Sequence, residues 1–279
     1  MSHSQHPVAL RLERQVGGAA RLLATVLALP LVDGIFPALV LAGTLTTATG
    51  ILEVGLLVFG GSATVAVVLA EMEGSRRERA KTTLVVGIPV IALAAVETAL
   101  APTIGSLIDL AVFERFAALV ILAVAAKTAS AQVGEYLPRP AVIVGLGMVA
   151  SVDPANAQLV VTPDLELVAR GALAATVGVA FALSVALASP WLHDTVHIDR
   201  FRFGSAVALG VLGLSVLGLV PSDAPLALAV LAVTTLLAFD PGRSRDEPDE
   251  DPSDDDAAAD PADPAADDSD VGPDRAPWL

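Results

Sequence analysis

The sequence predicts an all-α protein: a polytopic bundle of about eight transmembrane helices followed by a disordered acidic tail. Hydrophobic residues make up 54% of the chain and its mean hydropathy is +0.69, whereas soluble domains are roughly 45–50% apolar. The apolar residues gather in blocks near the roughly 20 residues that a helix needs to cross a bilayer core. Helices are expected because backbone groups in lipid must be satisfied internally, and an aromatic content of 4% disfavours a β-barrel.

The predicted spans are separated by short polar connections. The first stretch is read as retained rather than as a cleaved signal peptide, because it is long and holds an acid, Asp33, in its interior. The last stretch is short and follows its neighbour closely, so seven spans are the alternative. The eight stretches cover residues 22–42, 50–70, 82–101, 112–131, 140–161, 166–188, 203–220 and 225–239.

The placement of arginine and lysine predicts that both termini are cytoplasmic, because short basic loops stay on that side of a membrane. Every second connection is basic, with groups at residues 11 and 14, 76–81, 139, 200 and 202, and 243 and 245. The opposite side carries only Arg115 and Arg170. We therefore place the protein in the cell membrane and divide the chain into a cytoplasmic segment 1–21, a transmembrane domain 22–239 and a cytoplasmic tail 240–279.

The tail has a composition unlike the rest of the chain. Residues 240–279 contain 15 acids and 3 arginines, so they carry a net charge of −12 out of the whole chain's −15. A segment rich in Asp, Pro and Ala cannot bury enough apolar area to offset its ordering entropy. We expect it to be disordered and solvated, and a weak site for multivalent cations or a basic partner is the functional alternative.

Residue usage also bears on origin. The chain is acidic, has two lysines against fourteen arginines and has no cysteine, which excludes disulfides and thiolate chemistry. Such chains are typical of organisms with a salt-rich cytoplasm. With the segment LPLVDGIFP at residues 29–37 and the apolar core after it, the chain resembles an uncharacterised family of multi-pass membrane proteins from haloarchaea. The resemblance covers about residues 8–240 and implies no known activity and no functional residues.

Asp33 is the first candidate for a binding residue. It lies 11 residues into the first stretch, roughly 17 Å deep, and Pro30, Gly34 and Pro37 surround it. Proline removes a backbone N–H, so we expect the helix to be kinked or unwound there, with freed carbonyls beside a carboxylate. A buried charge at this depth usually faces a cavity or a partner. The alternative is a neutral aspartic acid that only fixes helix packing.

Asp153 repeats this pattern in the fifth stretch. It also lies roughly 18 Å deep, with Pro154 and Asn156 directly after it, so residues 140–161 form either a broken span or a re-entrant segment. Residues 32–40 align with residues 152–160 at an offset of 120. That alignment would make a parallel repeat of four spans per half, with Asp33 and Asp153 paired at the bilayer midplane. Chance similarity between apolar helices is the alternative.

Three further charges complete the set. Lys127 lies about 10 Å inside the cytoplasmic end of the fourth stretch, where it can snorkel to water or reach towards an aspartate. Glu53 and Glu97 lie near the external ends of the second and third stretches. Each is either an interfacial residue or part of an outer vestibule.

Other chemistry is disfavoured by the sequence. His193 and His197 have a spacing that can hold a metal but lack the His-Glu-x-x-His pattern, so we expect no metal and no cofactor. Ser62, in a Gly60-Gly61-Ser62 segment that suits close helix packing, would need a histidine base to act as a nucleophile, and no histidine lies in a span. We expect no enzyme activity.

The sequence thus favours a transporter or permease for a small ion or solute, H⁺ or Na⁺ in the simplest case. Its binding candidates are Asp33, Asp153, Asn156, Lys127, Glu97 and Glu53. The alternative is a non-transporting scaffold or accessory subunit. The expected partners are the lipid bilayer and the unidentified solute, without nucleic acid, and homo-oligomerisation is left open.

Overall fold

The computed structural model describes residues 18–154, 164–221 and 224–240, and within these ranges the chain is helical apart from turns and two isolated β-bridges. The expected all-α fold is confirmed there. The elements are α2 (Gly18–Val32), α3 (Ile35–Leu41), η1 (Thr44–Thr46), α4 (Ala48–Glu53), the π-helix η2 (Val54–Phe59), α5 (Ser62–Glu71), α6 (Arg76–Gly105), α7 (Leu110–Ala129), α8 (Ala131–Tyr136), α9 (Pro140–Ser151), α10 (Leu165–Thr195), α11 (Ile198–Val216) and α12 (Leu226–Leu237).

Length and composition identify the segments that could cross a membrane. Three are long and apolar enough: the α2–α3 stretch, α6 and α10. The α4–η2 stretch and α5, bent by 45° between them, would make a fourth if they form one broken span. Among the described residues, α9 and α12 are apolar but shorter, and α7 and α11 each carry three charged residues.

The surface of α6 shows why a bilayer suits these helices. Its inward face is made of small and β-branched residues such as Thr83, Ala94 and Thr98, all of which are buried. Its outward face is apolar as well, with Leu84, Val85, Ile88, Leu93, Val96 and Leu100 exposed. A helix that is apolar all round belongs in a large core or in lipid, and these side chains are left exposed by the described residues.

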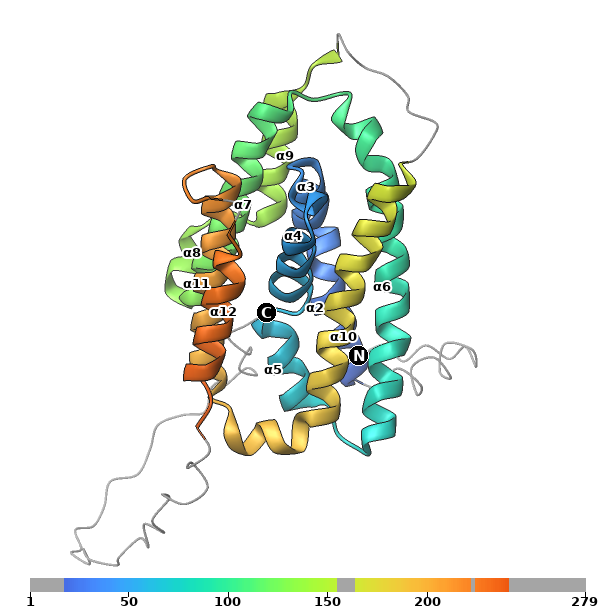
Figure 1. The fold of residues 1–279 in the computed structure, drawn as a ribbon, viewed down its shortest axis with the longest axis vertical. Helices are drawn as coiled ribbons and strands as arrows, with labels where there is room; N and C mark the ends of the chain where they lie inside the picture. Colours follow the sequence, from blue (N-terminus) through green and yellow to red (C-terminus); the bar gives the residue numbers. More distant parts are fainter. Residues whose placement is uncertain (1–17, 155–163, 222–223, 241–279) are drawn as a thin grey trace, which may run out of the picture.

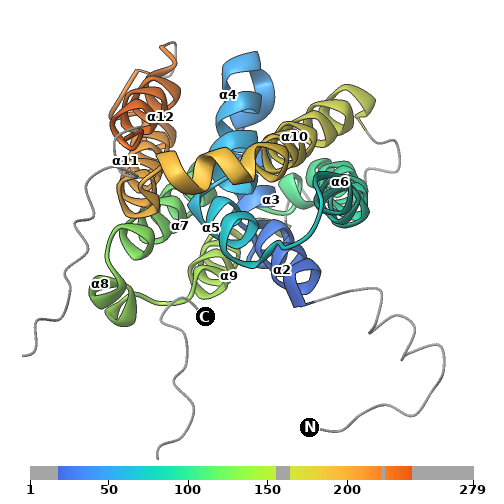
Figure 2. The same ribbon diagram turned by 90° about the horizontal axis from the view of Figure 1, so that it is seen from below.

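The long helices enclose the broken ones. Figures 1 and 2 show α6 beside α10 on one side and α7, α11 and α12 on the other, with α3, α4 and α5 between them. Helices α6 and α10 are antiparallel, because Gly87 packs on Val179 whereas the later Thr98 packs on the earlier Gly171. Helices α7 and α11 are antiparallel in the same way.

Two short backbone pairings tie the helix ends together. In the first clamp, residues 107–109 after α6 pair with residues 151–153 after α9, through Asp109 N to Ser151 O (2.6 Å) and Asp153 N to Leu107 O (2.8 Å). In the second clamp, residues 195–197 after α10 pair with residues 238–240 after α12 in the same pattern. Each clamp holds one antiparallel bridge, Ile108–Val152 and Val196–Phe239.

These clamps reveal an internal repeat. The first unit (α6, α7 and α9) and the second unit (α10, α11 and α12) contain helices of 30, 20 and 12 residues and of 31, 19 and 12 residues. The bridged residues correspond at offsets of 88 and 87. Phe113 and Phe201, each the fourth residue of its helix, are both buried. Because the partner helices are antiparallel, the two units have opposite orientations.

This repeat differs from the one suggested by the sequence. The alignment of residues 32–40 with 152–160 required a parallel repeat at an offset of 120, but helix lengths and clamps match at 87–88 in inverted orientation. The offset-120 repeat is therefore wrong. The alignment matched Val32-Asp33 with Val152-Asp153, but the first pair stands at a turn between two helices and the second in a clamp at a helix end. The N-terminal segment 1–17 and the predicted disordered tail from residue 241 lie outside the described residues.

Engineered disulfides test the repeat, because the chain has no native cysteine. Bridged residues of this pattern form non-hydrogen-bonded pairs, whose Cα atoms lie about 4.5 Å apart and suit a disulfide. We expect Ile108→Cys/Val152→Cys and Val196→Cys/Phe239→Cys each to form an intramolecular disulfide on oxidation, read as a mobility shift on non-reducing gels. The cross-end pair Ile108→Cys/Phe239→Cys should stay reduced, and efficient bridging of that pair would contradict the inverted arrangement.

Candidate functional site

Two broken helices meet inside the bundle. The first break is a turn at Asp33–Gly34 between α2 and α3, where Gly34 has φ +77°, a conformation that favours glycine. The predicted break beside Asp33 is therefore confirmed. The second break follows the π-helix η2 at Gly60–Gly61. The rings of Phe36 and Phe59 lie 5.2 Å apart at 61°, which places the two breaks side by side.

The second break was not predicted, because Gly60 and Gly61 were interpreted as packing residues. The Gly60 N–H bonds to Gly55 O at 2.9 Å, a five-residue reach that widens the helix before it ends. The Thr64 hydroxyl donates to Phe59 O at 2.8 Å and satisfies one freed carbonyl. Short π-helical turns are frequent at functional sites. The signal in the sequence that could have predicted this break is the Gly60-Gly61 pair inside an apolar run.

Both breaks start new helices without a side-chain cap. Gly34 precedes α3 and Gly61 precedes α5, and neither can offer a capping oxygen. The first N–H groups of a helix have no partner within it and carry a partial positive charge. Around the second break, Ser62 and Thr64 are buried. The two breaks thus bring the first N–H groups of two helices and two buried hydroxyls into an otherwise apolar interior.

Asp33 lies in the first break and is half-buried. Lys127, in the last turn of α7, is near enough for its charge to act on the Asp33 carboxylate. The Lys127 side chain also packs against Gly134 of α8, where a Cβ would lie 3.2 Å from its Cγ. Lys127 thus packs on α8 while its charge acts on Asp33, and its snorkelling to water or reaching towards an aspartate stays a prediction.

Glu97 of α6 lies at the level of Asp33. Leu41, at the end of α3, touches Gly105, at the end of α6. Glu97 precedes that contact by eight residues of helix, about 12 Å. Asp33 also precedes it by eight residues, those of the Asp33–Gly34 turn and α3, and α3 and α6 pack together. The Glu97 Oε2 atom is buried and has no hydrogen-bond partner among the described residues. An unpaired carboxylate oxygen in an apolar span marks a functional candidate.

Asp153 does not share that level. Its backbone N–H belongs to the first clamp, at the end of α6 and the start of α7. Gly34 lies against Val144 of α9, seven helical residues before Ser151, so the clamp lies about 10 Å beyond the first break. The expected midplane pairing of Asp33 with Asp153 is therefore wrong, because Asp153 is held in the clamp at the end of α9. Asn156 lies outside the described residues.

Glu53 has a structural partner. It is buried at the end of α4, and its carboxylate accepts a hydrogen bond from the backbone of Leu228 in the first turn of α12. Helix α12 has no side-chain cap of its own, since Pro225 occupies the cap position. Glu53 therefore caps α12 from another helix, a role that the sequence did not predict. A place in an outer vestibule remains untested.

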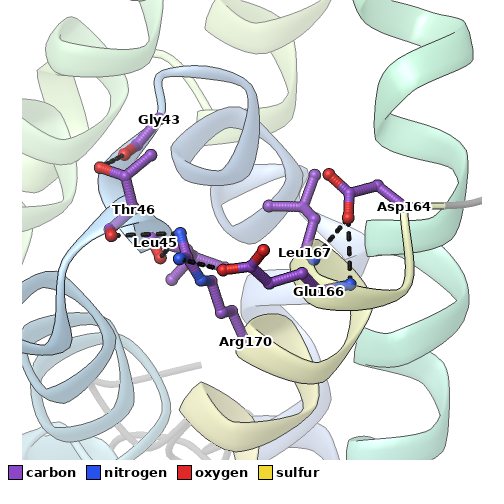
Figure 3. A network of polar contacts seen from close by, with 7 residues as sticks. All are labelled: Gly43, Leu45, Thr46, Asp164, Glu166, Leu167 and Arg170. Atoms are coloured by element: carbon purple, nitrogen blue, oxygen red, sulfur yellow. Dashed lines mark hydrogen bonds and ion pairs between the residues drawn. The ribbon is translucent and has the colours of Figure 1, made fainter.

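Arg170 connects the turn between α3 and α4 to α10. Figure 3 shows its guanidinium reaching from α10 to η1, where Nη1 donates to Thr46 O at 3.1 Å while Nη2 pairs with Glu166. Asp164 caps the same helix by accepting from the N–H groups of Glu166 and Leu167. This network holds the α3–α4 connection against the start of the second unit. The sequence indicated Arg170 only as an exception to the charge rule.

The histidine pair is divided between two helices. His193 belongs to the last turn of α10, whereas His197 precedes α11 and pairs with Asp240 at 3.1 Å. Over the described part of the chain, no three His, Asp or Glu side chains come close enough to share a metal ion.

Glycine contacts fix the second break against α10. A Cβ on Gly178 would overlap Phe59, and one on Gly145 would meet nothing within 4 Å. We expect Gly178→Ala to lower the thermal unfolding temperature in detergent, by an overpacking cost of about 1–3 kcal/mol. Gly145→Ala is the matched control and should leave that temperature unchanged or raise it. Equal effects of the two substitutions would contradict this packing.

The Glu53 cap can be tested separately. Glu53→Ala leaves the Leu228 N–H without its acceptor, so we expect a loss of about 1–3 kcal/mol, measured as a lower unfolding temperature. Glu53→Gln keeps an acceptor oxygen and should lose less. Faster proteolysis near α12 in the alanine variant alone would locate the effect, and equal loss in both variants would mean that the charge, not the hydrogen bond, matters.

Comparison with known proteins identifies one similarity. No curated protein and no solved structure matches the chain. Residues 90–217, from the middle of α6 to the end of α11, match the model of the "Family of unknown function (DUF5794)". The match includes most of both repeat units but not the broken helices α2–α5. The resemblance to an uncharacterised family is thus confirmed for residues 90–217, which are similar to DUF5794.

Proposed function

We propose that this protein is a membrane carrier for a small ion, H⁺ or Na⁺, and not an enzyme. The observation that carries the proposal is the position of Asp33, in a helix break and near the level of Glu97, whose buried Oε2 atom has no hydrogen-bond partner among the described residues. A charge held near the middle of a bilayer costs on the order of 2.5–3.5 kcal/mol on insertion scales. Two carboxylates kept there at that cost are better explained by binding a cation than by packing.

The proposed topology has eight spans and cytoplasmic termini. Helices α6 and α10 are antiparallel, so the chain between them must cross back and forth, through α7 and then α9. The broken α2–α3 and α4–α5 stretches precede them, and α11 and α12 follow. Basic residues then lie on one side at every second connection. Counting each broken stretch as one span gives eight spans, and an even number of spans leaves both termini on the same side.

The proposed mechanism uses the charges and the helix ends together. A proton or Na⁺ binds the Asp33 and Glu97 carboxylates and the carbonyls freed at the breaks. The Lys127 charge acts on Asp33 when the cation is absent. Inverted units around a central site are the arrangement in which rocking exposes that site to each side in turn. Asp153, in the first clamp, would act at the outer end of the path rather than at the binding level.

The proposed partners of the protein follow from this topology. The bilayer is the main partner, nucleic acid is not one, and a homo-oligomer would form through lipid-facing helices. A scaffold or accessory subunit is the competing function. It predicts that Asp33 and Glu97 can be neutralised without changing any flux.

Reconstituted liposomes can test the carrier. Full-length protein in vesicles loaded with a pH-sensitive or Na⁺-sensitive dye should dissipate an imposed gradient faster than empty vesicles. We expect Asp33→Asn and Glu97→Gln each to reduce that rate roughly tenfold, equivalent to about 1.4 kcal/mol. Both substitutions keep the side-chain shape and remove the charge.

The control is Asp194→Asn, which removes a carboxylate from an exposed position near the end of α10. It should leave the flux unchanged, and unfolding temperatures should confirm that all variants fold. Wild-type flux equal to that of empty vesicles, for H⁺ and for Na⁺, would overturn the proposal. Full flux in both Asp33→Asn and Glu97→Gln would also overturn it, because the ions would then cross the membrane without these carboxylates.

A further inference from the structure

An open groove runs between α2 and α6. Its volume is about 490 Å³, and its walls are almost entirely apolar. The α2 wall is made of Ala20, Ala24 and Ala28, one turn apart, and the α6 wall includes Val85, Pro89 and Leu93 at the same spacing. Small residues on one helix face larger ones on the other, so the two helices leave a space along their length.

One end of the groove is polar. Lys81 and Glu78 lie there, in the first two turns of α6. The Glu78 carboxylate is engaged by Ser75, whose N–H and hydroxyl both donate to Oε2 at 2.8 Å. Lys81 is exposed and forms no ion pair within the described residues, and Arg77 lies one turn below it on the same face of the helix. The charges of Lys81 and Glu78 balance, so the neighbouring Arg77 makes the net charge near this end positive.

The other end stops one turn below the proposed binding level. Leu93 precedes Glu97 by four residues, and Ala28 precedes Asp33 by five. From Lys81 to Leu93 the groove follows twelve residues of α6, about 18 Å. That length is close to the depth of one leaflet, which is half of a bilayer core of about 30 Å.

The geometry points to an anionic glycerophospholipid as the occupant of this groove. Its phosphate contacts Lys81, and one acyl chain lies along the alanines of α2 and the apolar face of α6. Water is a poor occupant because polar partners are found at only one end of the groove. Basic positions at the cytoplasmic end of transmembrane helices attract anionic headgroups, each worth about 1 kcal/mol near the surface.

This inference does not depend on ion transport, because lipid binding can be measured without any gradient. A bound lipid would also affect the stability of α2. The bound chain would fill the space beside α2 and support the helix just below its break at Asp33. A lipid site failing its test would leave the carrier proposal intact, and absence of flux would leave the lipid site intact.

Competition between two lipids tests the headgroup. Full-length protein in detergent is mixed with equal amounts of phosphatidylglycerol and phosphatidylcholine, and retained lipids are counted by native mass spectrometry. We expect phosphatidylglycerol to be retained in preference. Lys81→Gln should lower its retention about fivefold, and Lys81→Arg should restore it. Arg200→Gln, which removes an exposed charge at the start of α11, should have no effect.

Filling the groove tests the acyl chain. Ala24→Phe should reduce retention of both lipids, whereas Ala92→Phe, on an exposed position of α6 outside the groove, should not. Inorganic phosphate should not displace the lipid, because the chain contributes to binding. Equal retention of the two lipids by the wild type, or retention unaffected by Lys81→Gln and Ala24→Phe, would overturn the inference.

A cysteine probe separates lipid from water in the groove. In liposomes, Ala24→Cys should react slowly with a membrane-impermeant thiol reagent, and Glu73→Cys, on the exposed α5–α6 connection, should react quickly. Reaction of Ala24→Cys at the rate of Glu73→Cys would mean that the groove is an aqueous path and would contradict the lipid site.

Discussion

The close approach of α10 to its neighbours is the constraint on which the rest of the structure depends. Helices in lipid gain little from the hydrophobic effect and associate through packing of small residues. A Cβ on Gly178 of α10 would overlap Phe59 of η2, and a Cβ on Gly87 of α6 would overlap Val179 of α10. Helix α10 therefore packs on two different helices through positions that only glycine allows. Larger residues at Gly178 and Gly87 would separate α10 from the broken helix that contains η2 and from α6.

This packing determines where the polar groups lie. Phe59, held by Gly178, ends the π-helix and meets the ring of Phe36, just after the first break. The two breaks are thus brought together by contacts of apolar side chains, and the polar atoms follow from the backbone geometry of the breaks. Asp33 is part of one break, and Glu97 reaches the same level from α6, whose position is again set by α10. The carboxylates are located by packing rather than by a polar network of their own.

The sequence was informative where the signal is local. Proline and glycine beside Asp33 predicted the first break, and apolar runs predicted the helices. The level of Asp153 could not be derived in this way, because counting residues from position 140 gives its place along α9 but not the place of α9 against the first break, which depends on the contact of Gly34 with Val144. The shared level of Asp33 and Glu97 depends on the contact of Leu41 with Gly105, which joins residues far apart in the chain. Tertiary contacts of this kind leave no periodic signature in an apolar sequence.

The inverted repeat is a repeat of backbone, with unequal side chains at its two ends. Both clamps have two hydrogen bonds around one bridge. The second clamp adds the His197–Asp240 pair and the contact of Trp191 with Phe239, whose rings lie 5.1 Å apart. In the first clamp, Asp109 instead uses its carboxylate to cap α7. The two clamps therefore share their backbone pairing but differ in the side chains that support it. Two units that share a backbone topology but differ in these side chains give the fold two ends that are not equivalent, despite its pseudo-symmetry.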